Sequence, residues 1–316
     1  MNRNFVKDAL LGVAVGDAIG VPVEFKSRGY LKERPVIGMR GYGTHFQPEG
    51  TWSDDSSLTF CLAEMLAEKY DLVDLARRFV RWNYEAYWTP HGKLFDIGIA
   101  TSAAIDRLSD GAIPELAGGV HEDSNGNGSL MRILPLLFLV REKDIHSRFQ
   151  MIRDVSSLTH RHVRSVVSCF IYLEVAAQVM AGNDKVDAYR RACISSKAFL
   201  DETAVCPANE RKYFERALSG TIFTLSEKQI WSSGYVIHTL EAALWCFLTK
   251  GSYRDAVLQA ANLGEDTDTT AAVTGGLAAL YYGWESIPDD WLKVLARFED
   301  IEELCRRLNN KLEANG

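Results

Sequence analysis

The chain has 316 residues, with 42 Asp and Glu against 35 Lys and Arg, so its formal net charge is -7. A composition of 47% hydrophobic and 24% charged residues is typical of soluble globular proteins. The acidic excess argues against a general nucleic-acid binder, because contact with a phosphate backbone needs a basic face.

The same sequence gives no sign of a membrane or an oxidising compartment. No uninterrupted run of about 18 apolar residues stands out, and charged residues such as Lys7 and Asp8 break any signal-peptide core. The six cysteines lie far apart without a Cys-x-x-Cys pair, which favours buried free thiols over disulfides or a zinc ribbon. We therefore expect a cytoplasmic protein without a membrane partner.

The first predicted element is a helix with glycines at positions 12, 16 and 20. A spacing of four places them on one helix face, where another helix or a ligand can approach the backbone closely. Close helix packing is the commoner reason for such a pattern. The pattern ends at Val21 and Pro22, and Glu24 follows in a predicted loop from which it could reach a site.

Helical periodicity dominates the rest of the chain. Apolar residues recur at the spacing of one helix face in 58–66, 163–170 and 240–247. Gly182 stands where a helix-ending glycine belongs, and Ser252 is a typical residue for the start of another helix. Since alternation with period two is rare and short, the sequence predicts an all-α protein.

Three segments, 23–52, 84–98 and 109–128, are poor in helical pattern and rich in Gly, Pro, Asp, Asn or aromatic residues. Long irregular segments are uncommon inside a compact helical domain unless they line a site. No composition shift, linker or internal repeat marks a boundary. We therefore predict a single domain over residues 1–316, with its loops gathered at a cleft.

Two similar acid-rich segments, 52–57 and 265–270, stand at the starts of apolar helices. Helix capping is the simplest interpretation, but it needs only one side-chain oxygen and one further acid at each helix. Crowded carboxylates repel one another unless a cation lies between them, and Mg²⁺ prefers oxygen ligands. If the two helix starts converge, a two-ion cluster could be held by Ser53, Asp54, Asp55, Asp266, Asp268 and Thr269.

A Gly/Asn-rich segment, 123–129, leads into another apolar stretch. Such a loop before a helix presents unpaired backbone N–H groups, which suit a phosphate. It lacks the spacing of a P-loop or a Rossmann fingerprint, so it predicts no nucleotide-binding fold. A generic turn is the alternative.

Taken together and in this order, these segments resemble the ADP-ribosylglycohydrolase family. The family includes the dinitrogenase-reductase-activating glycohydrolase and the ADP-ribosyl-arginine and ADP-ribosyl-serine hydrolases. The matching segments are 12–25 (GVAVGDAIGVPVEF), 50–56 (GTWSDDS), 95–101 (FDIGIAT), 126–135 (GNGSLMRILP), 159–160 (TH), 234–245 (GYVIHTLEAALW) and 263–276 (LGEDTDTTAAVTGG). Their order over nearly the whole chain makes the match specific, although no single motif would decide it. The resemblance implies one all-α domain with a binuclear Mg²⁺ centre at the mouth of a cleft.

The resemblance also implies roles for individual residues. It implies metal ligation by Ser53, Asp54, Asp55, Asp266, Asp268 and Thr269; the first of these is more often Thr in the family. Asp96 matches an acid that acts on the ribose in the nitrogenase-regulating branch, and Glu24 matches an acid that contacts a metal or activates water in other branches. Together with Asp55 they are the expected catalytic residues. Substrate binding is implied for Ser124, Asn125, Gly126, Asn127, Gly128, His160 and Tyr235.

The activity implied by the resemblance is hydrolysis of the C1″ glycosidic bond of ADP-ribose conjugates, with two Mg²⁺ ions and Mn²⁺ as a substitute. The Asp96 motif favours removal of mono-ADP-ribose from a protein arginine. Other family substrates stay open: O-acetyl-ADP-ribose or a similar metabolite, ADP-ribosylated serine, or a nucleobase. The sequence does not decide the protein target, the physiological metal, the oligomeric state, or whether Asp96 or Glu24 is the principal acid/base.

Two other classes of function are alternatives to this prediction. A non-catalytic family member with a structural or binding role would keep the fold without turnover. Prenyl-pyrophosphate synthases are also all-α proteins with Asp-rich Mg²⁺ sites, but they typically carry a DDxxD motif. Here Asp54 and Asp55 are followed by Ser56, Ser57 and Leu58, so the third acid is missing.

Overall fold

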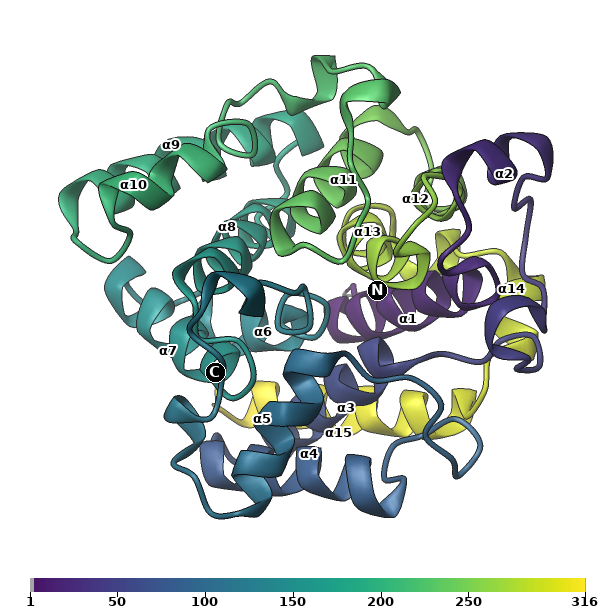
Figure 1. The fold of residues 1–316 in the computed structure, drawn as a ribbon, viewed down its shortest axis with the longest axis horizontal. Helices are drawn as coiled ribbons and strands as arrows, with labels where there is room; N and C mark the ends of the chain where they lie inside the picture. Colours follow the sequence, from purple (N-terminus) through teal and green to yellow (C-terminus); the bar gives the residue numbers. More distant parts are fainter. Residues whose placement is uncertain (1–2, 316) are drawn as a thin grey trace.

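The computed structural model describes residues 3–315, and in that range the regular structure is helical, with three isolated β-bridges as the extended pairing. The all-α prediction is confirmed. The α-helices, shown in Figure 1, are α1 (Phe5–Gly20), α2 (Arg28–Glu33), α3 (Asp54–Glu68), α4 (Leu72–Glu85), α5 (Ile99–Ser109), α6 (Leu137–Val140), α7 (Ile145–Ser157), α8 (Val163–Met180), α9 (Lys185–Glu202), α10 (Ala208–Arg211), α11 (Val236–Thr249), α12 (Tyr253–Asn262), α13 (Thr267–Tyr282), α14 (Asp289–Val294) and α15 (Phe298–Asn315).

Helices α1 and α13 pack against each other in the middle of the molecule (Figure 1). Gly12 faces Gly275, and Gly20 faces the backbone of Asp268, so the two helices run antiparallel. A Cβ on Gly12 would lie 2.5 Å from the Gly275 carbonyl oxygen, which leaves room for no side chain there. The glycine face therefore serves helix packing, and it brings the end of α1 next to the start of α13.

Local signals placed several helix ends correctly. Ser252 caps α12 by accepting a hydrogen bond of 3.1 Å from the Asp255 backbone N–H. Gly182 follows α8 with φ +82°, a conformation that favours glycine. The prediction that 23–52 is irregular was wrong in part, because α2 lies within it. The Ser27 hydroxyl accepts from the Tyr30 N–H and starts this short helix, a capping signal that periodicity over six residues does not reveal.

Within the described residues, α8 alone is long and apolar enough to cross a membrane by length and composition. The sequence analysis did not expect such a segment. In the structure 78% of the apolar window is buried within the molecule, and the helix packs against α7, α9 and α11. Its charged residues are both paired, Arg164 with Glu210 and Glu174 with Arg148. These features are typical of a core helix.

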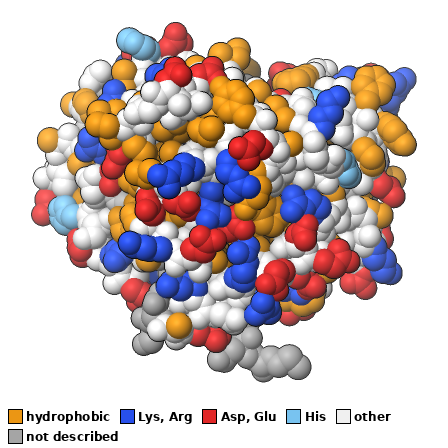
Figure 2. Space-filling view, turned by 90° about the horizontal axis from the view of Figure 1, so that it is seen from below, with side chains coloured by type: hydrophobic (Ala, Val, Ile, Leu, Met, Phe, Trp, Pro, Cys, Tyr) orange, Lys and Arg blue, Asp and Glu red, His pale blue; other side chains and the backbone are white. Residues whose placement is uncertain are grey.

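The core is one continuous cluster of apolar side chains drawn from nearly every helix. All six cysteines are buried and unpaired, as the sequence predicted. Figure 2 shows the molecule from below the view of Figure 1, and on this face acidic and basic side chains are interspersed with apolar ones. The charges on this face therefore form no continuous basic stripe.

Candidate active site

The end of α1 and the starts of α3 and α13 meet beside the α1–α13 contact. Asp17, in the last turn of α1, joins α1 to α3. This fully buried carboxylate accepts hydrogen bonds from the backbone N–H groups of Ser53 (2.9 Å) and Ser56 (3.0 Å), and from the Ser56 hydroxyl (2.6 Å). The side chain of Asp17 therefore fixes the first turn of α3 against α1, while Gly20 admits the start of α13.

The two acid-rich helix starts converge in this arrangement. Carboxylate oxygens of Asp17, Asp55 and Asp268 lie within 4.8 Å of one another, and those of Glu24, Asp266 and Asp268 form a second group of the same size. Because Asp268 belongs to both groups, they make one continuous acidic cluster. The sequence had left this convergence open.

Capping explains only part of these segments. Ser53 does cap α3, since its hydroxyl accepts from the Asp55 N–H at 3.3 Å. Asp266 is the N-cap of α13, but its side chain makes no capping bond and instead accepts from the Asn127 side-chain amide at 2.7 Å. The remaining oxygen of Asp266, and one oxygen of Asp55, are buried without any hydrogen-bond partner. Unpaired buried carboxylate oxygens are costly, which marks them as free ligand positions.

The pKa values of these carboxylates also favour a metal site. Burial, followed by repulsion from neighbouring acids, raises the pKa of Asp54, Asp55 and Asp268 well above the ordinary value. Burial also raises the pKa of Asp17 to about 6 and that of Glu24 to about 7. Among the described residues no Lys or Arg lies within 4.0 Å of these carboxylates. A hard divalent cation fits this set of oxygen donors and would offset the repulsion.

A third group extends the cluster toward solvent. Oxygens or nitrogens of Glu24, His45 and Asp96 also lie within 4.8 Å of one another, and His45 Nε2 is 2.5 Å from Glu24 Oε2. His45 ends the short 3-10 helix η2 (Gly43–His45). The hydrogen bond from His45 to the Glu24 carboxylate raises the pKa of His45.

A cavity of about 360 Å³ opens beside these acids, with the Gly/Asn loop as another part of its wall. The predicted site residues that line it are Glu24, Asp54, Asp96, Gly126, Asn127, Gly128, His160, Asp266 and Thr269. Asp55 and Asp268 lie in the acidic cluster, and Ser53 contacts Asp55 through its hydroxyl at 3.0 Å. The structure therefore brings most of the predicted residues to one place.

His160 supports the Gly/Asn loop from the protein interior. The ring is buried, and Nδ1 lies 2.8 Å from the Thr159 hydroxyl. Burial, with the nearby charge of Arg132, lowers the pKa of His160 to about 3, so the ring is neutral. A Cβ on Gly128 would lie 2.8 Å from the ring, so only glycine lets the loop pack this closely.

Three predicted substrate-binding residues do not line this cavity. The Asn125 side-chain amide donates to the Glu122 carbonyl (3.0 Å), and the Asn125 carbonyl accepts from the Val236 N–H (3.0 Å). Ser124 lines a neighbouring cavity, and Tyr235 packs edge-on against His238. In this structure Asn125 and Tyr235 hold the loop in place from behind.

Two residues at the site were missed by the sequence analysis, Asp17 and His45. A usable signal existed for Asp17, because an acid inside an apolar, glycine-faced helix must have buried partners. No local pattern singled out His45, which stands in an irregular segment and reaches Glu24 only through the fold.

The whole chain was then compared with known proteins. The sequence profile of the ADP-ribosylglycohydrolase family matches residues 2–316. The chain belongs to the ADP-ribosylglycohydrolase family. Among its relatives is the ADP-ribosylarginine hydrolase Tri1 of Serratia proteamaculans, 33% identical over 305 residues, which are 96% of this chain and 78% of that protein.

Two further likenesses agree with this family. The ADP-ribosyl-[dinitrogen reductase] glycohydrolase of Rhodospirillum rubrum is 26% identical over 294 residues, covering 91% of this chain and 88% of that one. A solved structure described as an ADP-ribosylglycohydrolase-related protein complex superimposes with a TM-score of 0.79 at 30% identity. It covers 99% of this chain and 100% of the other. The helical architecture is therefore that of the family.

Proposed function

We propose that this protein is a Mg²⁺-dependent hydrolase that removes mono-ADP-ribose from a modified arginine side chain of a protein. The observation that carries the proposal is the buried carboxylate cluster, with unpaired oxygens on Asp55 and Asp266, at the wall of a cavity that also meets a Gly/Asn loop. The relative named ADP-ribosylarginine hydrolase, at 33% identity, supports arginine as the attachment site. The six buried thiols support a cytoplasmic setting.

The metal-binding residues follow from the donor chemistry. The carboxylates of the cluster and the adjacent hydroxyls would hold two Mg²⁺ ions, with Mn²⁺ as a substitute; these residues are Ser53, Asp54, Asp55, Asp266, Asp268 and Thr269. Bound there, the ions supply charge for orienting ribose hydroxyls and lower the pKa of a bound water. Asp17 has its oxygens occupied by the Ser53 and Ser56 donors, so its role is to orient the first turn of α3.

The protein's own groups account for the rest of the chemistry. Cleavage at C1″ develops positive charge on the sugar, which the carboxylates facing the cavity stabilise. Glu24 and Asp96 both line that cavity. One carboxyl in its protonated form can donate to the departing nitrogen, while an ionised one accepts a proton from the attacking water. The raised pKa of Glu24, about 7 through burial, suits such an exchange near neutral pH.

The other wall of the cavity would receive the pyrophosphate. Gly126 and Gly128 line this wall, and the lack of side chains lets them pack against the neutral His160 ring, which adds no charge. Asn127 ties the loop to the acidic cluster through its hydrogen bond to Asp266. The distal part of ADP-ribose and the sugar at C1″ would thus be held by two connected elements.

The decisive experiment measures release of ADP-ribose from an arginine-modified protein, with Mg²⁺ and with EDTA. We expect Asp268→Asn to lose about 10²-fold or more of the Mg²⁺-dependent rate, because it removes a carboxylate shared by both acidic groups. Asp110→Asn, an exposed acid after α5, is the matched control and should keep full activity. Full activity of Asp268→Asn with EDTA present would refute the metal-dependent mechanism.

Two further assays refine the proposal. Asp96→Asn should lower kcat far more than it raises KM, because the side chain faces the cavity and acts on the sugar; an unchanged kcat would remove Asp96 from catalysis. A panel of substrates with arginine, serine, nucleobase and O-acetyl linkages tests the attachment site. The arginine conjugate is expected to have the highest kcat/KM.

A further inference from the structure

Three large aromatic side chains of the segment 25–46 are exposed: Phe25 (67% exposed), Tyr42 (66%) and Phe46 (80%). Phe25 itself lines the cavity. Tyr42 and Phe46 flank η2, and His45 of η2 contacts Glu24, which also lines the cavity. We call Phe25, Tyr42 and Phe46 the aromatic rim.

All three residues of the aromatic rim have a left-handed backbone. The φ angles are +64° for Phe25, +64° for Tyr42 and +55° for Phe46. Bulky residues rarely adopt this conformation, because the side chain crowds the backbone, and glycine or asparagine is favoured there. Exposed rings contribute little to folding, so stability explains neither the residue type nor the conformation. Strained positions of this kind gather at binding and catalytic sites.

The rim is held firmly by the elements that form the active site. The Phe25 N–H donates to the Glu265 carbonyl (2.7 Å), and the Glu265 N–H donates back to the Lys26 carbonyl (2.8 Å). The Thr44 hydroxyl donates to the Glu24 carbonyl at 2.7 Å. These bonds fasten both rim segments to the acidic cluster, so the rings are ordered before any partner arrives. Aromatic rings presented in this way bind at low entropic cost.

The position of the rim decides what can occupy it. A conjugate enters the cavity with its ADP-ribose inward, so the acceptor that carries the sugar must leave through the mouth, beside Phe25. Ile99, 90% exposed at the start of α5, also lines this cavity and adds an apolar contact from another element. Aromatic faces suit the apolar and guanidinium groups of a polypeptide's side chains. Tyr42 and Phe46 do not line the cavity that would hold ADP-ribose, so they are left for the polypeptide part of a conjugate.

A second apolar surface offers a useful contrast. A groove of about 610 Å³ between α4 and the segment after α5 exposes Val73 (49%) and Ile113 (61%). Neither residue has a positive φ, and neither lines the active-site cavity. Exposure alone therefore does not set the rim apart; its place at the cavity mouth and its backbone conformation do.

We infer that the aromatic rim is a docking surface for the polypeptide segment on either side of the ADP-ribosylated arginine, and that it makes the enzyme prefer modified proteins over small conjugates. This inference rests on the proposed function. It concerns how the acceptor is recognised, and it assigns no chemical step to the rim.

The test uses Tyr42→Asn, Phe46→Asn and the double variant, because asparagine removes the ring and tolerates the left-handed helical conformation that Phe46 adopts. Two substrates are compared: an arginine-ADP-ribosylated protein and free ADP-ribosyl-arginine. We expect the double variant to lose about ten-fold or more in kcat/KM on the protein, mainly through KM, with a change of at most about two-fold on free ADP-ribosyl-arginine. Val73→Asn and Ile113→Asn, in the groove between α4 and α5, are the matched controls and should change neither value.

Each other outcome has a defined meaning. Equal losses on both substrates, or no loss on the protein, would overturn the docking surface while hydrolysis itself stands. A double variant that changes the sedimentation of the protein but not kcat/KM would assign the rim to contacts between copies and overturn the inference. If the wild-type protein releases ADP-ribose from neither substrate, the proposed function fails first and the inference falls with it. Thermal melting checks that the variants remain folded.

Discussion

Each end of α3 carries a buried carboxylate, and the two have equal exposure but pKa values shifted in opposite directions. Asp54, at the start of the helix, and Glu64, three turns later, are each 7% exposed. Burial raises the pKa of Asp54 well above its ordinary value, and repulsion from Asp96 and other acids adds to this. Burial would raise the pKa of Glu64 as well, but hydrogen bonds from Arg307, Tyr87 and other donors outweigh it and lower the value.

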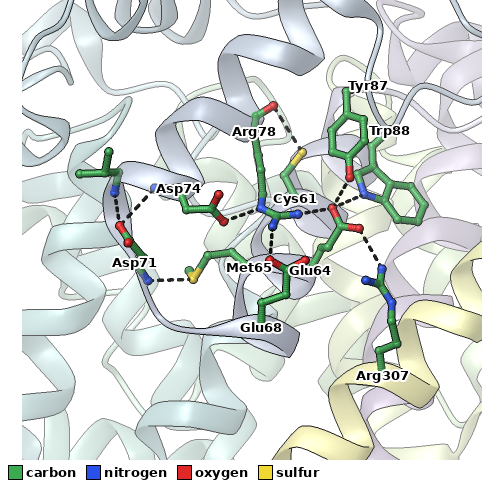
Figure 3. A network of polar contacts seen from close by, with 11 residues as sticks. Cys61, Glu64, Met65, Glu68, Asp71, Asp74, Arg78, Tyr87, Trp88 and Arg307 are labelled. Carbon is green, nitrogen blue, oxygen red and sulfur yellow. Dashed lines mark hydrogen bonds and ion pairs between the residues drawn. The ribbon is translucent and has the colours of Figure 1, made fainter.

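Figure 3 shows why Glu64 differs. The carboxylate points into a ring of donors: Arg307 at 2.8 Å, the Trp88 indole at 3.1 Å, and the Tyr87 hydroxyl and Arg78 guanidinium in closer contact. Arg78 in turn is shared with other acids of α3 and α4. Every charge in this network has an opposite charge beside it, so it holds α3, α4 and α15 together.

At the start of α3 the acids face one another and a cavity, with no Arg or Lys in contact among the described residues. The exposed fraction is the same at both ends, so exposure does not distinguish a structural carboxylate from a functional one, whereas the partners do. A protein can tolerate the repelling cluster only because the rest of the fold, including the Glu64 network, stabilises it.

The largest expected effect on stability comes from breaking the paired end. Glu64→Gln should destabilise the protein by about 3–5 kcal/mol, because it leaves the buried Arg78 and the partly exposed Arg307 without their shared partner. Denaturant unfolding measures the loss. Glu68→Gln is the matched control: its side chain is 55% exposed, so the same Arg78 loses only a surface partner, and the change should stay within about 1 kcal/mol. Equal losses in the two variants would refute the structural role of Glu64.

A substitution at the start of α3 should change the free energy of unfolding in the opposite direction. Asp54→Asn removes one repelling charge without changing the volume, so in EDTA we expect a gain of about 0.5–2 kcal/mol in the free energy of unfolding, together with loss of hydrolysis. The same unfolding experiment in Mg²⁺ should show the gain disappear, since the wild-type protein is then stabilised by its ions. If Asp54→Asn lowers the free energy of unfolding in EDTA, the Asp54 carboxylate is stabilised by its neighbours and the expected repulsion is absent.

The pH dependence of stability distinguishes the acidic cluster from the Glu64 network in one experiment. Glu24 (pKa about 7) and Asp17 (pKa about 6) bind protons more tightly in the folded metal-free protein than in the unfolded chain. Stability in EDTA should therefore fall as pH rises from about 4 to about 7, by up to about 1.4 kcal/mol per pH unit for each proton.

The lowered pKa of Glu64 acts in the other direction. Its contribution is present above the ordinary Glu value and is lost as pH falls through the folded value. The free energy of unfolding, measured between pH 4 and 8 in EDTA, should thus reach its maximum below pH 7. Mg²⁺ should reduce the loss of stability above that maximum. A curve that rises steadily to pH 7 without metal would contradict the raised pKa values of the cleft.

Much of this protein is readable from short stretches of sequence. Ser53 and Ser252 start helices, Gly182 follows one, and apolar periodicity marks most of the longer helices, because capping and helix amphipathicity depend on neighbours a few residues apart. Seven short segments in the family's order were sufficient to recognise the family. Those features determined the helical class and predicted half of the residues that line the cavity.

The tertiary structure decided which of these residues meet. Asp55 and Thr269 are 214 positions apart, yet a hydrogen bond of 3.3 Å joins them, because the glycine face of α1 lets α13 approach its backbone. The same packing buried Asp17 as an anchor for α3 and brought His45 to Glu24. Asn125 and Tyr235 are not part of the cavity lining. Local sequence sets the direction of each helix end, but only the packing of distant helices sets the distance between two carboxylates, and on that distance the proposed metal site depends.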